Sequence, residues 1–156
     1  MVELDAFERR IVRELQANAR LSNQELAERV GLSPSACWRR VKRLETEGVF
    51  TRFSAQVDRH KLGLHEVVFA HVSLHRHTKG ATEEFMDKVL RREEVQECYA
   101  LTGENDYLLR VVVSDVRAYH AFLEEVLFVL PHISKVNSNF ALQEIKYDTA
   151  VPLPER

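Results

Sequence analysis

Residues 21–48, LSNQELAERVGLSPSACWRRVKRLETEG, carry the clearest structural signals in the N-terminal part of the chain. Ser22 and Glu25 have the spacing of a capping box, and Gly31 is placed to end the short helix that follows. Ser33 is a suitable N-cap for a second helix, whose first residue is a proline. Two short helices joined by a tight turn that contains glycine are typical of a helix-turn-helix.

An amphipathic helix is predicted upstream of this pair, over residues 6–17. Asp5 and Glu8 repeat the capping-box spacing, and apolar residues at positions 7, 11 and 15 recur every four residues. A helix with one apolar face in front of the pair would complete a small three-helix core. The N-terminal part is therefore predicted to be an independent α-helical unit.

The helix that follows Ser33 is predicted to have one apolar and one basic face. On a helical wheel Cys37, Val41 and Leu44 lie within about 60° of one another and form a buried seam. The opposite side of the helix carries small side chains near the helix start and cations further along. No acidic residue occurs between Ser33 and Leu44. Such a face suits the major groove of double-stranded DNA, where arginine can contact guanine and other cations hold phosphates. The candidate DNA-binding residues are Asn23, Gln24, Ser33, Ser35, Ala36, Arg39, Arg40, Lys42 and Arg43.

An ordinary solvated basic face is the alternative, but the capped helix pair around it favours DNA binding. Trp38 is expected to pack against the first helix or the following segment rather than to stack on a base. Arg40, at the border of the seam, is expected to form a local salt bridge or to touch a phosphate. Residues 1–52 contain 10 basic and 8 acidic residues, whereas the remainder contains 12 and 16, so an anionic partner should meet the N-terminal part.

A second domain is predicted after an extended segment and a linker that ends at Gly63. We therefore assign residues 1–60 to DNA binding and residues 61–156 to ligand sensing and oligomerisation. Strands and helices alternate as βαββαβ in the second domain, with the expected elements at 67–75, 81–92, 95–102, 107–114, 116–130 and 133–147. This order predicts an α+β fold with a ferredoxin-like antiparallel sheet and both helices on one face. Because no third helix is predicted, a second copy of the chain is the natural cover for the other face.

A polar loop is predicted between the two central strands of this sheet, with the sequence TGEND at residues 102–106. Its carboxylates could hold an ammonium group, and free backbone N–H groups beside Gly103 could hold a carboxylate. A plain β-turn without a ligand explains the same residues. The candidate effector-binding residues are Thr102, Gly103, Glu104, Asn105, Asp106, Tyr107 and Ser138.

Histidines and cysteines do not indicate a metal site or a cofactor. His71, His75 and His77 share a strand face, but no cysteine or carboxylate stands at a matching spacing, so a surface or interface cluster is favoured. Cys37 and Cys98 lack CxxC spacing and are interpreted as reduced core residues. No hydrolase, phosphate-loop or zinc-protease motif is found.

The chain resembles the Lrp/AsnC family, the leucine-responsive or feast/famine regulators. The resemblance is carried by residues 4–50, by LTGENDYLLRV at 101–111 and, less specifically, by SNFALQEIKYDTAVPL at 138–153. It implies a winged helix-turn-helix, a RAM-type βαββαβ sensor, dimers that assemble into octamers or similar oligomers, and amino-acid effectors bound where neighbouring dimers meet. The chain departs from many relatives at Trp38 and Arg39, where leucine and an acidic residue are common, so no relative's operator sequence is transferred.

These patterns predict a sequence-specific transcriptional regulator, not an enzyme, that binds double-stranded DNA and is modulated by a small effector such as an amino acid. Two alternatives remain: an architectural DNA-binding protein without an effector, and an amino-acid-binding metabolic module. The second leaves the capped basic helix unexplained. No apolar run reaches the roughly 20 residues of a membrane helix and residues 1–5 do not open a signal peptide, so a cytoplasmic protein is expected.

Overall fold

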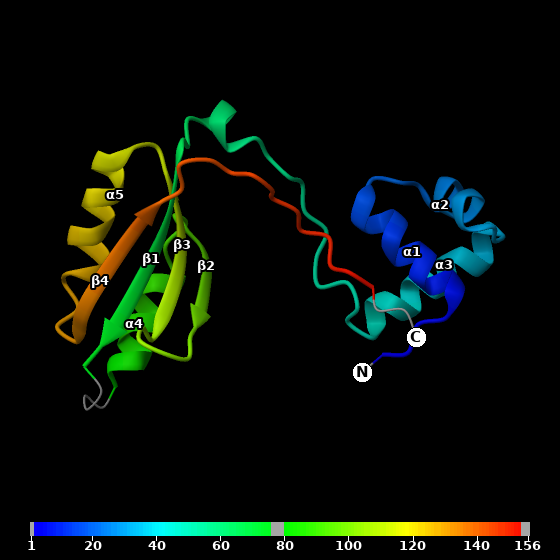
Figure 1. Ribbon diagram of the computed structural model, residues 1–156. Helices are drawn as coiled ribbons and strands as arrows, with labels where there is room; N and C mark the ends of the chain where they lie inside the picture. The colour runs from blue at the N-terminus through cyan, green and yellow to red at the C-terminus, as the bar shows by residue number, and fades with distance from the viewer. Residues whose placement is uncertain (1, 76–79, 154–156) are drawn as a thin grey trace. The chain divides into compact units, whose positions relative to one another are not determined.

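The computed structural model describes residues 2–75 and 80–153, which form two compact units (Figure 1). Residues 2–56 and 146–153 make up the first unit, and residues 57–145 the second. The boundary lies close to the one predicted near residue 60. The C-terminal segment differs from the assignment made from the sequence, because residues 146–153 belong with the helical unit.

The first unit contains the three predicted helices, α1 (Ala6–Ala17), α2 (Asn23–Val30) and α3 (Pro34–Thr46). Both capping boxes form as predicted, and Gly31 ends α2 in the left-handed conformation with a φ of 74°. Glycine adopts this conformation without the steric cost of a side chain, which allows the tight turn into α3. Local signals in the sequence therefore set the bounds of all three helices.

The core of this unit joins the apolar faces of the three helices. Its buried side chains are Ile11, Val12, Leu15, Leu26, Ala27, Val30, Cys37 and Leu44. The predicted seam of α3 is confirmed for Cys37 and Leu44, and Val41 is partly buried against the same core. Trp38 is about half exposed, at 54%, and lines a pocket together with Leu15 of α1 and Phe53 of the segment after α3, the two neighbours predicted for it.

Two segments without regular secondary structure complete the helical unit. Residues 49–57 are extended, as predicted, and form no strand within the described part of the unit. The C-terminal segment is tied to α1, because Gln16 exchanges hydrogen bonds of 2.7 and 3.2 Å with the backbone of Val151. Leu153 packs against the helical core, which explains why this segment groups with the first unit.

The second unit is a four-stranded antiparallel sheet with the order β2-β3-β1-β4, the predicted βαββαβ arrangement. Its elements are β1 (Glu66–Leu74), α4 (Ala81–Leu90), β2 (Val95–Ala100), β3 (Tyr107–Val113), α5 (Val116–Phe122) with a following π-helical turn, and β4 (Ile133–Phe140). The last strand stops seven residues before the predicted end at Tyr147.

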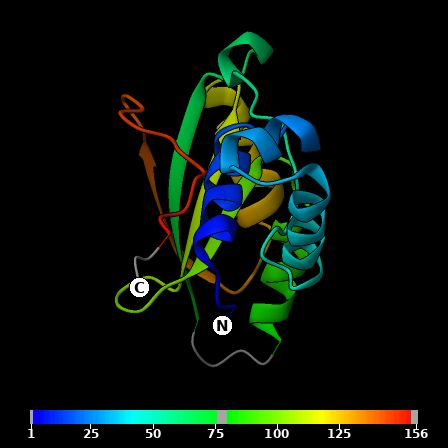
Figure 2. The same cartoon turned by 90° about the vertical axis from the view of Figure 1, so that its right-hand side faces the viewer.

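The two faces of this sheet are unequal. Helices α4 and α5 lie on the same side of it (Figures 1 and 2), where Phe85 and Phe122 pack on alternate residues of β1 and β3. Strand alternation places Phe69, Leu108 and Arg110 on the other side. These three side chains are only partly buried, and no helix in the described part of this unit covers them.

Candidate functional site

The outward face of α3 is formed by four exposed residues that recur along one side of the helix, Ser35, Arg39, Lys42 and Thr46. Arg39 has no hydrogen bond or ion pair with any residue that the structure describes. The Lys42 ammonium lies 2.6 Å from Glu45 of the same helix, in an exposed pair that costs little to break. This face therefore presents a free guanidinium and a readily released ammonium.

The first turn of α3 has small side chains, and a serine caps its N-terminus. The Ser33 hydroxyl accepts a hydrogen bond from the Ala36 amide at 3.3 Å and lies 3.3 Å from the Ser35 hydroxyl. Asn23, at the start of α2, donates from its side-chain amide to the Pro34 carbonyl at 2.8 Å and so ties the two helices together. Gln24 of the candidate set is exposed beside Glu28. Small residues at a free helix N-terminus allow the backbone to approach an anion closely.

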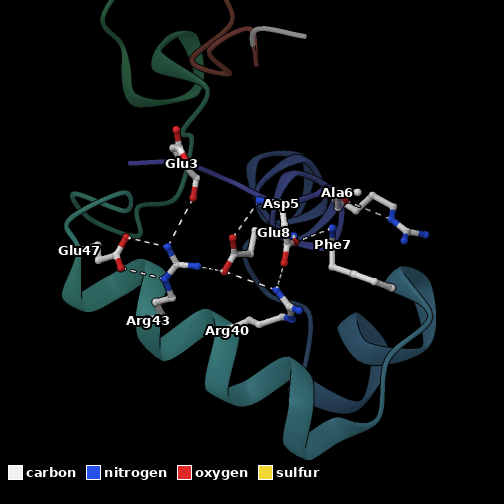
Figure 3. Close-up of polar contacts among 9 residues, drawn as sticks. Glu3, Asp5, Ala6, Phe7, Glu8, Arg40, Arg43 and Glu47 are labelled. Carbon is white, nitrogen blue, oxygen red and sulfur yellow. Dashed lines mark hydrogen bonds and ion pairs between the residues drawn. The ribbon is translucent and has the colours of Figure 1, made fainter. Parts of the chain in front are cut away.

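Arg40 and Arg43 point toward the start of α1 instead of outward (Figure 3). Arg43 Nη1 donates to Glu8 Oε1 at 2.7 Å, and its Nε donates to Glu47 Oε1 at 2.8 Å. Arg40 pairs with Asp5 and lies 3.5 Å from Glu8. The local salt bridge considered for Arg40 is confirmed. Arg43 lies away from the buried seam, as predicted, with 47% of its side chain exposed, but unlike Arg39 it is paired with carboxylates.

Glu8 has a role that the sequence patterns did not reveal. Only 1% of it is exposed, and it is the one charged residue that is buried among the described residues. Burying a charge is costly unless it is paired and hydrogen-bonded. Glu8 meets this requirement, because Oε2 accepts from the Asp5 amide at 3.0 Å while Oε1 faces the two guanidinium groups. The capping-box spacing of Asp5 and Glu8 in the sequence predicts the hydrogen bond from the Asp5 amide to Glu8, but not the ion pairs of Glu8 with α3.

The polar loop between β2 and β3 lies beside the end of β1. Asp106 Oδ2 accepts a hydrogen bond from the Leu74 amide at 2.8 Å, and Asn105 accepts from Ser73 at 3.4 Å. Thr102 is exposed, and Gly103 adopts a φ of 114°, which favours glycine. The structure thus supports the β-turn interpretation and leaves several polar groups together at one end of the sheet.

A cation that the sequence interpretation missed lies at this end of the sheet. Lys135 of β4 pairs with Glu104 at 3.2 Å. The two residues are 31 positions apart in the sequence, so only the sheet order brings them together. The loop therefore combines carboxylates, an ammonium group and a glycine backbone.

Tyr107 and Ser138, the other two effector candidates, face the helices. The Tyr107 ring lies 4.6 Å from that of Phe85, and the Ser138 hydroxyl lies 2.6 Å from that of Tyr119. Burial raises the pKa of Tyr119, and the Ser138 hydrogen bond only partly offsets this effect. Ser138 pairs in register with Ala70 of β1, away from the loop. The structure thus does not bring these two side chains together with the polar groups of the loop.

The remaining chemically reactive side chains form no site among the residues that the structure describes. His71 has a buried Nδ1 without a hydrogen-bond partner, His75 is exposed, and His77 lies outside the described residues. No group of histidine, cysteine and carboxylate side chains within 2–75 and 80–153 could hold a metal ion. Cys37 and Cys98 are free thiols, and burial raises the pKa of each. No helix of the described chain is long and apolar enough to cross a membrane.

A capped helix-turn-helix followed by an antiparallel α+β domain defines a class of two-domain DNA-binding regulators. Family models agree with this division: a winged helix-turn-helix DNA-binding model matches residues 4–51, and the Lrp/AsnC ligand binding domain matches residues 67–151. The chain belongs to the Lrp/AsnC family, which is made up of transcriptional regulators and not of enzymes.

Relatives match nearly the whole chain. The leucine-responsive regulatory protein of Escherichia coli K12 is 37% identical over 154 residues, which cover 99% of this chain and 94% of the relative. A Neisseria meningitidis transcriptional regulator, solved as a complex with L-methionine, is 39% identical, with a TM-score of 0.93 and coverage of 96% and 97%. An AsnC family regulator from Agrobacterium tumefaciens is 38% identical, with a TM-score of 0.91 and the same coverage. These matches confirm the predicted fold class and family.

The Asp5 carboxylate gives the helical unit a pH-dependent contribution to its stability. Burial raises its pKa, but hydrogen bonds from the Glu8 amide, Arg40 and the Phe7 amide outweigh this effect and lower the pKa below its ordinary value. The contribution is therefore complete above the pKa of the unfolded chain and is lost as the pH falls through the folded value. We expect Asp5→Asn, which retains a capping side chain, to lower the free energy of unfolding at neutral pH but progressively less below about pH 4.

Denaturation followed by the fluorescence of Trp38, the only tryptophan of the chain, would report on this unit. Asp87→Asn on α4 is the control for the loss of one negative charge. A difference between the wild type and Asp5→Asn that does not change with pH would contradict the ion-pair assignment.

Proposed function

We propose that the chain binds double-stranded DNA through the outward face of α3 and that a small effector, an amino acid, modulates this binding or the assembly of the protein. The observation that carries the proposal is the exposed and unpaired Arg39, among the described residues, beside the small capped start of α3. The match to a DNA-binding family model over residues 4–51 supports it.

Arg39 is the residue of α3 best placed to contact a base edge. Arginine donates two parallel hydrogen bonds to guanine, and its side chain must be free to do so. Ser35, one turn earlier, is small enough to let the helix enter the groove, and Lys42 fits a phosphate contact. Arg40 and Arg43 are not included in this set because carboxylates of α1 and α3 hold them.

We expect Arg39→Ala to weaken specific DNA binding by about 1 to 3 kcal/mol, because a bidentate base contact is lost. Gel-shift titrations against an operator duplex and a scrambled duplex measure the effect. Lys88→Ala on α4 is the control with the same change in net charge. Equal loss of affinity for both duplexes would assign Arg39 to a phosphate, and unchanged affinity for both would remove α3 from the groove.

The polar loop is the proposed effector site, supported by its clustered charges. The L-methionine complex of the Neisseria relative supports an amino acid as the effector. An amino acid offers an ammonium and a carboxylate group. Asp106 retains a second carboxylate oxygen for the ammonium, with Glu104 as the alternative. Backbone N–H groups near Gly103 and the Lys135 ammonium suit the carboxylate. Ser138 is a weaker candidate because its hydroxyl already bonds to Tyr119.

A thermal-shift screen of the amino acids would identify the effector, since a ligand that binds only the folded protein raises its melting temperature. We then expect Asp106→Asn to weaken binding of that amino acid about tenfold or more, the usual effect of losing a charge-assisted hydrogen bond. Asparagine retains an oxygen for the Leu74 amide, so the loop should stay folded. Asp87→Asn is the control in calorimetry. Wild-type affinity in Asp106→Asn would place the ammonium site elsewhere, and no response to any amino acid would favour an architectural DNA-binding protein.

The open face of the sheet is proposed as the surface on which two copies pair. Phe69 and Leu108 are apolar and only partly buried there, and no helix within the described residues covers them. Pairing of equivalent faces would give a homodimer, from which octamers or similar assemblies could form. We expect Leu108→Asp to shift the protein toward the monomer in light scattering at micromolar concentration. Leu90→Asp, on an exposed residue at the end of α4, is the control. A wild-type monomer would contradict the proposal.

A further inference from the structure

The helix α3 carries its cations in two groups with different surroundings. Arg39 and Lys42 are exposed on the outward face, whereas Arg40 and Arg43 turn toward α1 (Figure 3). Glu8 lies at the centre of the second group, buried and within 2.7 Å of Arg43 and 3.5 Å of Arg40. This carboxylate therefore contacts the two cations of α3 that are directed away from its outward face.

The donors of Arg43 are nearly all used inside the protein. Its Nη1 bonds to Glu8, its Nε bonds to Glu47, and its Nη2 lies 3.5 Å from both the Glu3 carbonyl oxygen and Glu47 Oε2. A guanidinium has five N–H donors in a fixed plane, so these bonds also fix the orientation of the side chain. Two carboxylates thus neutralise the Arg43 charge, and a DNA phosphate would have to compete with both.

Arg40 is held in a similar way but less completely. It pairs with Asp5, its guanidinium lies 3.5 Å from Glu8, and it also sits 5.4 Å from the centre of the Phe7 ring. Both arginines therefore bridge α3 to the first turn of α1. Because Glu8 of α1 contacts both arginines of α3, these ion pairs restrict rotation of α3 about its axis relative to α1.

We propose that Glu8 is a positioning residue for DNA binding: its buried carboxylate withholds Arg43 from DNA and fixes α3 so that Arg39 and Lys42 form the DNA-binding face. This inference rests on the proposed DNA binding through α3, and it adds that Arg43 of the same helix does not contact DNA. Withholding a cation lowers the sequence-independent attraction to phosphates and leaves base contacts to decide affinity. Glu8 thereby favours specific over non-specific binding.

The proposal predicts a change in the salt dependence of binding. Each phosphate contact contributes about 0.9 to the slope of log K against log salt concentration. Glu8→Gln removes one of the two carboxylates that hold Arg43. Only the exposed pair with Glu47 then remains, and a phosphate can displace it at little cost. We expect this variant to bind a scrambled duplex about threefold or more tightly at low salt, with a slope steeper by about one, and to discriminate less between operator and scrambled duplexes. A merely structural role for Glu8 would weaken binding to both duplexes without steepening the slope.

The test uses fluorescence anisotropy of the full chain with both duplexes at several salt concentrations. Glu14→Gln is the matched control, because Glu14 lies on the same helix, loses the same charge and pairs with Arg29 at the surface at 3.0 Å. Its slope is expected to rise less than that of Glu8→Gln. The double variant Glu8→Gln with Arg43→Gln should return the slope to the wild-type value. An unchanged slope in Glu8→Gln, or a rise equal to that of Glu14→Gln, would overturn the proposal.

Arg43→Gln alone supplies a second test if Glu8→Gln fails to fold. The proposal predicts a wild-type slope for Arg43→Gln and a slope reduced by about one for Lys42→Gln, since Lys42 contacts a phosphate and Arg43 does not. A reduced slope in Arg43→Gln would overturn the proposal. Failure of the proposed α3 interface gives a different result, in which Arg39→Gln binds both duplexes like the wild type at every salt concentration.

Discussion

The pairing of the buried Glu8 carboxylate with two arginines of α3 is the constraint on which the DNA-binding unit depends. A three-helix unit of this size has a small core. The ion pairs add directional contacts between the first turn of α1 and the middle of α3. They turn two cations inward and leave the opposite side of the helix, with Arg39, exposed. The pairing of Arg40 and Arg43 with Glu8 therefore leaves Arg39 and Lys42 as the cations of the outward face.

The four-stranded sheet of the second unit likewise has one face covered by helices and one face that they leave uncovered. Alternate residues of β1 and β3 face the helices and form a closed apolar core, while the residues between them form a surface that the helices do not cover. The polar loop lies at one end of this sheet, with its backbone held to β1 through Asp106. A ligand bound there would lie beside residues of β1 and β4.

Local rules were sufficient for most of the fold. Both capping boxes, the glycine that ends α2 and the proline that begins α3 depend on residues within four positions of one another, and all of them form as predicted. The order βαββαβ likewise follows from alternating periodicities along the chain. The differences concern partners and extent: Arg43 is paired with Glu8, β4 is shorter than predicted, and residues 146–153 group with the helical unit. Each of these depends on which distant segment lies nearby.

Short-range spacing encodes the bounds of the three N-terminal helices, the succession of strands and helices along the chain, the basic character of α3 and the polar loop, so these could be predicted without a structure. The tertiary structure alone decided which cations are free. Arg43 and Glu8 are 35 residues apart, and Lys135 and Glu104 are 31 apart, so no local pattern pairs them. A helical wheel predicts on which face of a helix a cation lies. Whether a carboxylate from another helix pairs with that cation depends on how the two helices pack. Burial then makes that pair costly to break, because a carboxylate removed from water requires a partner.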